Sequence, residues 1–330
     1  MLRVGLIGAG GIAGAHVQGY LANPGLTRLV AVADPVEASA RRRAEPAGAV
    51  VFDSYERMLA EADVDAVDIC LPHHLHRDAI VAAAEAGRHI LCEKPLCLST
   101  AEAADVRAAV ESAGVTLMCA HNQLFSPPVA KARELIAAGT IGEVYEVRTT
   151  DSFYNDFDPD SMGWRAHTAT SGGGELIDTG YHPSYLLLHL ADAAPVSVAA
   201  MLSTHRLAFM EGEDSAQLLV RFANGVVGSL VTSWAYTPTA NTERFSVVGS
   251  LGSVHALGPT LHLRIRDGES TEYTFEPVDE FAAEIRHFAE SIASGRAPLH
   301  SHREGIQTLE LILAAYRSAE TGTIAQVETA

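Results

Sequence analysis

The sequence is poor in basic residues. It has 23 Lys and Arg against 41 Asp and Glu, which gives a formal net charge of -18 over 330 residues. Nucleic acids and other polyphosphates bind proteins largely through basic patches, so this balance argues against such partners. It does not exclude one phosphate-bearing cofactor, because the N-terminus of a helix can bind a pyrophosphate without net positive charge.

Cysteines are few and long apolar runs are absent. Cys70, Cys92, Cys97 and Cys119 show no close zinc-finger spacing, which favours reduced, buried thiols in a reducing compartment. No apolar run approaches the ~20 residues of a membrane span, and the N-terminus begins in a strand pattern instead of a signal peptide. We therefore expect a cytoplasmic protein without a membrane partner.

The first 120 residues alternate short apolar strands with helical stretches. The expected strands are almost continuously apolar, as in a parallel sheet covered by helices on both faces. Ser99, with Glu102 three residues later, predicts a capping box before a helix over residues 101–113, and another helix is expected over 78–86. The predicted strands cover residues 3–7, 29–33, 50–52, 66–71, 89–92 and 116–120.

The pattern changes after about residue 122. Asn224-Gly225 and Asp267-Gly268 are typical of tight hairpin turns between alternating runs. Such runs cover residues 143–154, 196–204, 216–222, 226–234 and 245–248, with helices expected over 129–138, 278–293 and 304–318. The fold class predicted is α/β: a doubly wound parallel sheet over 1–122, then an α+β domain with a large, open, mostly antiparallel sheet over 123–330.

A glycine-rich motif follows the first predicted strand. Gly8 permits a tight turn, Gly10 lets the backbone approach a pyrophosphate, and Ala13 allows a helix to pack closely on the strand. Asp34 ends the second strand, where a carboxylate binds the ribose hydroxyls of adenosine and repels a 2′-phosphate. The sequence predicts a Rossmann domain that prefers NAD. The arginines at 41–43 leave NADP open, because one of them could reach back to a phosphate.

Two further motifs carry groups suited to proton transfer. Lys94 follows the fifth predicted strand, at the edge where open parallel sheets bind ligands, although an exposed loop lysine is the alternative. Asp178 and His182 follow three glycines and are four residues apart, so they share one face if the segment is helical. An imidazole beside a carboxylate is a suitable proton acceptor near neutral pH. The alternative for His182 is a helix-start histidine satisfied by backbone.

Together these motifs resemble the glucose–fructose oxidoreductase / inositol dehydrogenase / rhizopine catabolism family over nearly the whole chain. The resemblance implies an N-terminal Rossmann domain and a substrate-binding domain with an open sheet. It implies hydride transfer between NAD(P) and a hydroxyl or carbonyl carbon of a sugar, cyclitol or similar molecule. The motifs, in chain order, are the glycine stretch at 8–14, Leu71-Pro72 with His76, Glu93-Lys94-Pro95, Trp164-Arg165, the stretch 172–182 and the segment 318–322.

The resemblance also implies roles for three side chains. Lys94 would hydrogen-bond the reacting oxygen, His182 would act as general acid and base, and Asp178 would orient and tune the site. Leu71 and Leu124 depart from the family, which often has threonine and arginine there, so the polar lining near the nicotinamide should differ.

The predicted contact residues form two sets, one for the cofactor and one for the substrate. Those for the cofactor are Gly8, Gly10, Gly11, Ile12, Ala13, Asp34, Leu71, Pro72, His74, His76, Glu93, Lys94, Asn122, Trp164 and Arg165. Those for the substrate are Lys94, His121, Tyr154, Arg165, Asp178, His182 and Tyr236. No metal site is expected, because the histidines at 73, 74 and 76 lack a carboxylate at ligand spacing.

Two other functions stay open. Some members of the family use bound NAD to cleave glycosides by transient oxidation, and a non-catalytic NAD-sensing regulator could have the same fold. The presence of Lys94, Asp178 and His182 disfavours the regulator. Residues 216–222 and 226–234 alternate apolar side chains on both faces, which predicts a homodimer or homotetramer formed through the second domain's sheet.

Overall fold

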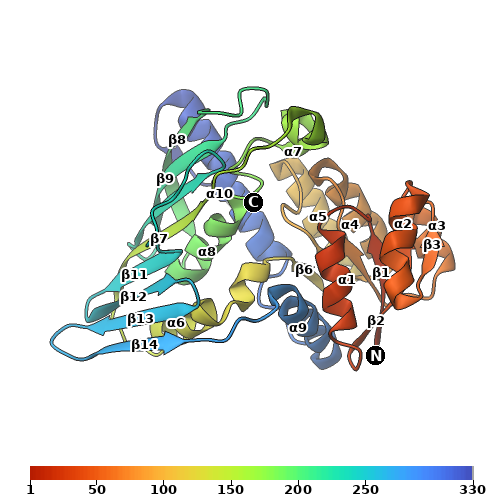
Figure 1. Ribbon diagram of the computed structural model, residues 1–330, viewed down its shortest axis with the longest axis horizontal. Helices are drawn as coiled ribbons and strands as arrows, with labels where there is room; N and C mark the ends of the chain where they lie inside the picture. The colour runs from red at the N-terminus through yellow and green to blue at the C-terminus, as the bar shows by residue number, and fades with distance from the viewer. Residues whose placement is uncertain (329–330) are drawn as a thin grey trace. The chain divides into compact units, whose positions relative to one another are not determined.

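The computed structural model describes residues 1–328, which divide into two compact units (Figure 1). The first unit contains residues 1–122 and 279–306, and the second contains 123–278 and 307–328. This differs from the predicted division, which placed all residues after 122 in one domain. An amphipathic pattern shows that a helix is packed on one side but does not identify what it packs against.

Helix α9 (Glu280–Ser294) accounts for that difference, since it packs against α1 (Ala13–Leu21) in the first unit (Figure 1). A Cβ atom on Gly19 would lie 2.6 Å from Ile285 Cδ1, so a glycine allows the two helices to approach. Asn23 Nδ2 also donates to the carbonyl oxygen of Ala282 at 2.9 Å.

The first unit contains a six-stranded, wholly parallel sheet in the order β3-β2-β1-β4-β5-β6, the strand order of a Rossmann fold. The prediction for this half is confirmed. Its strands are β1 (Leu2–Ile7), β2 (Thr27–Ala33), β3 (Val50–Phe52), β4 (Ala66–Ile69), β5 (His89–Cys92) and β6 (Leu117–Cys119). Its other helices are α2 (Glu37–Ala44), α3 (Tyr55–Glu61), α4 (His76–Glu85) and α5 (Thr100–Ala113).

The predicted cap of α5 is present. The Ser99 hydroxyl accepts the N–H of Glu102 at 3.2 Å, and the Glu102 carboxylate accepts the N–H of Leu98 at 2.7 Å. The helix starts where the sequence predicted because these side chains satisfy N–H groups that its first turn leaves unpaired.

The second unit contains a nine-stranded sheet in the order β14-β13-β12-β11-β7-β10-β9-β8-β15. Within this sheet, β7–β10 is the only parallel pair among the described strands, so the sheet is mostly antiparallel, as predicted. Its predicted strands are β7 (Val144–Ser152), β8 (Pro195–Ser203), β9 (Ser215–Phe222), β10 (Val227–Ser233) and β11 (Phe245–Gly249). The hairpin turns at Asn224-Gly225 and Asp267-Gly268 join β9 to β10 and β13 to β14.

Four strands of this sheet had no predicted bounds, although the Asp267-Gly268 turn indicated a hairpin where β13 and β14 lie. They are β12 (Gly252–Leu257), β13 (Thr260–Ile265), β14 (Ser270–Thr274) and β15 (Ala325–Gln326). β14 is mostly exposed and β15 is two residues long, so neither has the apolar alternation that predicts a half-buried strand.

One face of the second sheet is covered by helices. Helix α8 (Tyr181–Ala191) packs on β7 and β10, and α6 (Pro127–Ala137) packs on β12 and β13. Helix α10 (His302–Thr321) begins in the first unit and continues into the second. Among the described helices, none combines the length and the apolar character that a membrane span requires.

The other face of this sheet leaves large apolar side chains in solvent. Met201 on β8 is 79% exposed and Leu219 on β9 is 58% exposed. In the strand register, Met201 pairs with Gln217, two residues from Leu219 on the same side of β9. Val227 on β10 and Val248 on β11 are also exposed.

Candidate active site

The glycine loop and Asp34 meet in the first unit. Gly8 has φ of 91°, and a Cβ atom there would lie 2.5 Å from the carbonyl oxygen of Cys70, so only glycine fits. The N–H of Ala9 donates to Asp34 Oδ2 at 2.8 Å. A Cβ atom on Gly10 or Gly11 would meet nothing within 4 Å, so this part of the loop is open to a ligand.

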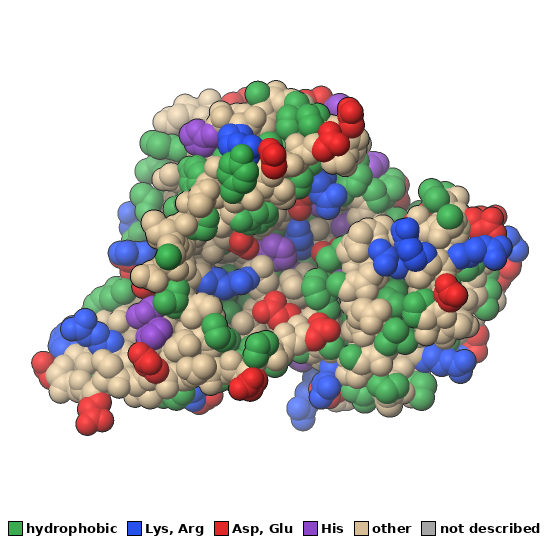
Figure 2. All heavy atoms as spheres, in the orientation of Figure 1, with side chains coloured by type: hydrophobic (Ala, Val, Ile, Leu, Met, Phe, Trp, Pro, Cys, Tyr) green, Lys and Arg blue, Asp and Glu red, His purple; other side chains and the backbone are tan. Residues whose placement is uncertain are grey.

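The side chain of Arg43, a residue of α2, lies against this loop. Its guanidinium donates to the carbonyl oxygens of Gly10 at 2.7 Å and Gly11 at 3.3 Å. A Cβ atom on Gly14 would lie 2.7 Å from this guanidinium, so Gly14 leaves room for it. Basic side chains gather over α2 with acidic ones beside them (Figure 2), and Arg41 pairs with Glu37 at 2.5 Å. The structure gives Arg43 no carboxylate partner among residues 1–328.

Lys94 lies directly after β5, half-buried, and its peptide bond to Pro95 is cis. Its backbone N–H donates to Glu93 Oε2 at 3.1 Å. The ring of His76 joins the loops that follow β4 and β5: Nδ1 lies 2.6 Å from the oxygen of Pro95, and Nε2 lies 2.7 Å from the oxygen of Leu71. His76 therefore fixes the two loops that were predicted to contact the cofactor.

His121, predicted to contact the substrate, follows β6 and is buried. Its Nδ1 lies 2.6 Å from Nδ1 of His300, so one proton is shared between two rings. His300 comes from the returning segment 279–306, and nothing in the sequence near residue 121 indicates this partner. Asn122 opens a short 3-10 turn over Asn122–Phe125.

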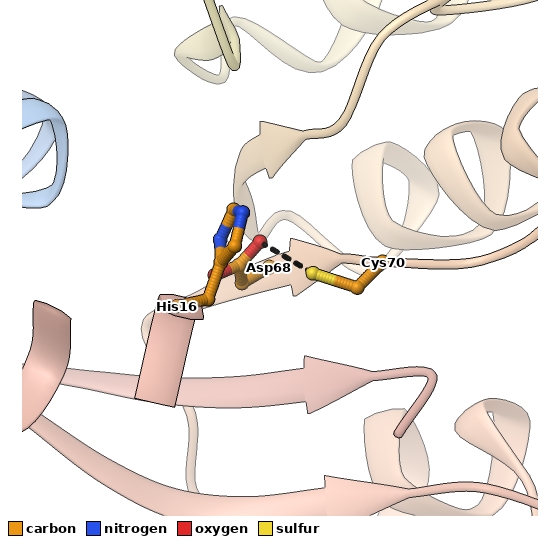
Figure 3. A group of neighbouring side chains, drawn as sticks. All are labelled: His16, Asp68 and Cys70. Atoms are coloured by element: carbon orange, nitrogen blue, oxygen red, sulfur yellow. Dashed lines mark hydrogen bonds and ion pairs between the residues drawn. The ribbon is translucent and has the colours of Figure 1, made fainter. Parts of the chain in front are cut away.

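A buried cluster of side chains that the sequence analysis missed lies between α1 and β4 of the parallel sheet (Figure 3). His16 from α1 points toward Asp68 of β4, with its Nδ1 2.8 Å from Asp68 Oδ2, and Cys70 Sγ lies 3.6 Å from Asp68 Oδ1. These ligand-type atoms lie within 4.8 Å of one another. Tetrahedral zinc ligands sit about 3.4 Å apart, so the His16–Asp68 distance is that of a hydrogen bond.

In the second unit, Asp178 and His182 do not share one helix. Helix α8 begins at Tyr181, and Asp178 lies in the turn before it, because the stretch after the three glycines folds as turns. Asp178 Oδ2 accepts from Arg165 Nε at 2.7 Å. His182 Nδ1 lies 2.9 Å from the hydroxyl of Tyr185, one helical turn further on, which orients the imidazole ring.

A pocket of about 330 Å³ opens beside the Arg165–Asp178 pair. Trp234 forms part of its wall, and its indole N–H donates to Thr179 Oγ1 at 2.8 Å. Two of the predicted substrate residues, Arg165 and Asp178, are therefore brought together here. The lining residues are Phe153, Phe157, Ser161, Met162, Arg165, Asp178, Thr179 and Trp234.

Three other predicted residues contact different partners. Trp164 stacks under the Arg165 guanidinium, whose carbon lies 4.3 Å from the ring centre. The guanidinium carbon of Arg206 lies 3.9 Å from the centre of the Tyr154 ring. The ring centres of Tyr236 and His205 are 5.8 Å apart. Tyr154 and Tyr236 do not line the 330 Å³ pocket.

Two buried carboxyl groups hold the glycine stretch in place. Burial, with Glu213 nearby, raises the pKa of Glu175 well above its usual value and favours its neutral form. Its Oε1 lies 2.5 Å from Thr232 Oγ1. Glu213 accepts the N–H of Leu176 at 2.9 Å. A Cβ atom on Gly174 would lie 2.0 Å from the carbonyl oxygen of Glu213, which explains the glycine.

The Rossmann sheet, its open glycine loop and the separate sheet-based unit define the class of nicotinamide-dependent oxidoreductases. Residues 2–121 match the family model described as "Oxidoreductase family, NAD-binding Rossmann fold". Residues 129–255 match the model of the GFO/IDH/MocA C-terminal domain. The chain belongs to the GFO/IDH/MocA family and is an NAD(P)-dependent oxidoreductase.

Named relatives are similar over almost the full length. The chain is 30% identical to 1,5-anhydro-D-fructose reductase of Ensifer adhaerens, covering 100% of this chain and 99% of the relative. It is 32% identical to inositol 2-dehydrogenase of Rhizobium meliloti (strain 1021), covering 96% of each. A solved structure of levoglucosan dehydrogenase with NADH and levoglucosan has a TM-score of 0.90 at 27% identity, covering 99% of both chains.

Proposed function

We propose that this protein transfers a hydride between NAD and a hydroxyl or carbonyl carbon of a compact, uncharged polyol such as a monosaccharide, anhydrosugar or cyclitol. The pocket beside Arg165 and Asp178 is the observation that carries the proposal. The names of the relatives, which act on anhydro-sugars and inositol, support the same substrate class.

The size and charge of this pocket favour small neutral substrates. A volume of about 330 Å³ is at the lower end of ligand sites. The one cation in its lining, Arg165, is paired with Asp178, so the described lining has no net charge for a sugar acid or a phosphate. Phe157 and Trp234 pack edge to face, with ring centres 5.1 Å apart, and give an apolar wall for the C–H face of a ring.

Alcohol oxidation needs a proton acceptor as well as a hydride acceptor. NAD accepts only the hydride, so protein groups must take the hydroxyl proton. We assign this task to Lys94 and His182, with Asp178 as the carboxylate that tunes the site. In reduction the same groups return the proton, and Lys94 stabilises the developing oxyanion.

The scarcity of lysine supports this assignment. Only two of the 23 Lys and Arg residues are lysines, Lys94 and Lys131. Lys131 forms an ion pair with Glu134 at 2.7 Å on α6, where arginine would serve as well. Arginine stays protonated in proteins, whereas a lysine amine can release its proton, so proton transfer requires lysine at position 94.

The site favours NAD over NADP. The Asp34 carboxylate is held by the N–H groups of Ala9 and Val36, both at 2.8 Å, in a position to accept the ribose hydroxyls. The loop after β4, with Leu71, Pro72 and His74, completes the proposed cofactor contacts together with Glu93 and Asn122. We further propose a cytoplasmic location, in keeping with four free, buried cysteines.

A substrate panel tests this function. Inositols, aldoses, anhydrosugars and glycosides are incubated with NAD or NADP, and sugar acids and nucleotide sugars serve as charged comparators. We expect reduced cofactor at 340 nm with neutral polyols and NAD. Turnover of charged comparators alone would contradict the proposed substrate class. Release of an aglycone without net NADH would instead show glycoside cleavage, and NAD binding without any turnover would indicate a regulator.

A further inference from the structure

We infer that His16 is a positioning residue for Lys94 and that it acts through Glu93. The inference rests on the role proposed above for Lys94. His16 comes from α1, where it was not part of any motif, and its side chain is fully buried. Its two ring nitrogens contact two different carboxyl groups, and one of these belongs to the residue before Lys94.

Asp68 sets the protonation of the first ring nitrogen. Its Oδ2 accepts from the Tyr20 hydroxyl at 2.8 Å and lies 2.8 Å from His16 Nδ1, while Oδ1 faces the Cys70 thiol at 3.6 Å. A fully buried carboxylate with these three partners is an acceptor for all of them. His16 Nδ1 therefore carries a hydrogen, and Nε2 is directed at the second carboxyl group, that of Glu93.

Glu93 connects His16 to Lys94 through its two carboxyl oxygens. His16 Nε2 lies 3.0 Å from Glu93 Oε1, and Glu93 Oε2 accepts the backbone N–H of Lys94 at 3.1 Å. One side chain of α1 thus links β4 to the first residue of the loop that carries Lys94. Chains of buried hydrogen bonds of this kind fix a reactive side chain more tightly than the loop backbone alone.

The surrounding charges keep the link intact. Burial alone would lower the pKa of His16, but Asp68 and Cys70 together raise this pKa well above its usual value. Burial raises the pKa of Glu284 on α9, which also faces His16, Asp68 and Glu93, and thus favours the neutral form of its carboxyl group. The thiols of Cys70, Cys92 and Cys119, which lie close to this group, are also kept neutral by burial. His16 thus bridges the carboxyl groups of Asp68 and Glu93.

The two-lysine composition gives a direct test. Selective ¹⁵N-lysine labelling yields two backbone amide signals, one from Lys94 and one from Lys131 in the second unit. In His16→Gln, one amide side chain cannot contact both Asp68 and Glu93, so the Lys94 amide signal should shift. The Lys131 signal should stay in place and report a folded protein.

Tyr20→Phe is the matched control. It removes another donor to Asp68 from the same helix at the same depth, but it leaves the His16–Glu93 contact. We expect little change at the Lys94 amide in this variant. Glu93→Gln should also stay near the native spectrum, because its amide can accept from Lys94 and donate to His16. Glu93→Leu breaks the link from the other end and should match His16→Gln.

Kinetics add a second readout. With the panel substrate that the native protein oxidises fastest, His16→Gln should lower kcat by about 10- to 100-fold, as expected for a misplaced reactive group. The Kd for NAD should change by less than about threefold, because the glycine loop is unchanged. An unshifted Lys94 amide in both His16→Gln and Glu93→Leu, or equal shifts in His16→Gln and Tyr20→Phe, would overturn the inference.

These outcomes separate the inference from the proposed function. If Lys94→Ala retains full activity, the role of Lys94 is wrong, whatever the amide spectrum shows. If Lys94→Ala is inactive but the amide of Lys94 ignores His16, only the link through Glu93 is wrong. Should His16→Gln fail to fold, Glu93→Leu and Glu93→Gln provide the same comparison.

Discussion

Two single residues carry the proposed cofactor binding and proton transfer: Asp34 and Lys94. Asp34 is held by two backbone N–H groups, and Lys94 is held through its own N–H by the preceding glutamate. Both were named from the sequence because their positions at strand ends are encoded locally. His16 was not, because Glu93 is distant in sequence and only the folded sheet brings the two side chains together. The arginines at 41–43 were named as a group, but the contact of Arg43 with the glycine loop depends on the fold.

At this scale, Lys94→Ala should lower turnover by about two to four orders of magnitude, the usual range for a positioned proton-transfer group. NAD binding should change only a few-fold, because the glycine loop and Asp34 are untouched. Turnover and NAD affinity are measured side by side. Lys131→Ala, which removes the other lysine, is the control and should keep native turnover. A Lys94→Ala variant as active as the native protein would refute the assignment.

Asp34→Ala should weaken NAD binding much more than NADP binding. The variant loses the hydrogen bonds to the ribose hydroxyls, while the repulsion of a 2′-phosphate is relieved. Arg43 of α2, whose guanidinium contacts the glycine loop, then remains as a cation for that phosphate. Titration of each cofactor by protein fluorescence gives both dissociation constants. An equal loss of affinity for the two would contradict the NAD preference.

At the scale of elements, the sequence indicated most helices and strands but not their partners. The cap of α5 and the Asn224-Gly225 turn depend on side chains within a few residues, so they were predictable. The start of α8 was not, because Glu175 and Glu213 hold the glycine stretch as turns through contacts with β10 and α10. The packing of α9 in the first unit likewise depends on contacts across 260 residues or so, such as Asn23 with Ala282.

The buried Glu284 of α9 makes a pH-dependent prediction. Its folded-state pKa is raised by burial, so the folded protein keeps a proton that the unfolded chain loses above its usual value of 4.5. Stability is therefore fully present below that value and falls as pH rises, by at most about 1.4 kcal/mol per pH unit. Glu284→Gln should remove this loss of folding stability at higher pH.

We expect the stability gain of Glu284→Gln over the native protein to grow between pH 5 and pH 8. Thermal unfolding at several pH values measures it. Glu290→Gln, an exposed position on the same helix, should show a difference that does not depend on pH. A constant difference for Glu284→Gln would mean that the group is ionised in the folded state.

At the scale of the whole molecule, the exposed apolar face of the second sheet predicts a homo-oligomer. Met201 and Leu219 lie in solvent on one face of the sheet, and large exposed apolar patches are unusual on a monomer. Closed two-fold assemblies are the commonest way to cover such a face. We expect a homodimer or homotetramer, and light scattering at micromolar concentration measures its mass.

The native protein should have two or four times the chain mass of 35.0 kDa. Leu219→Glu should dissociate it, because the added charge would be costly to bury in the interface. Leu299→Glu, at an exposed apolar position in the first unit, should leave the mass unchanged. A native mass near 35.0 kDa would refute the prediction.

Transfer of a labelled hydride tests the central claim most directly. NADH deuterated at C4 is incubated with the keto forms of neutral sugars and cyclitols, and the products are analysed by mass spectrometry. We predict that deuterium appears on the carbon of the new hydroxyl group with the native protein, and that Lys94→Ala reduces this transfer by at least about a hundredfold. If the label stays in the cofactor with every neutral compound, although NADH binds, the protein is not the polyol oxidoreductase described above.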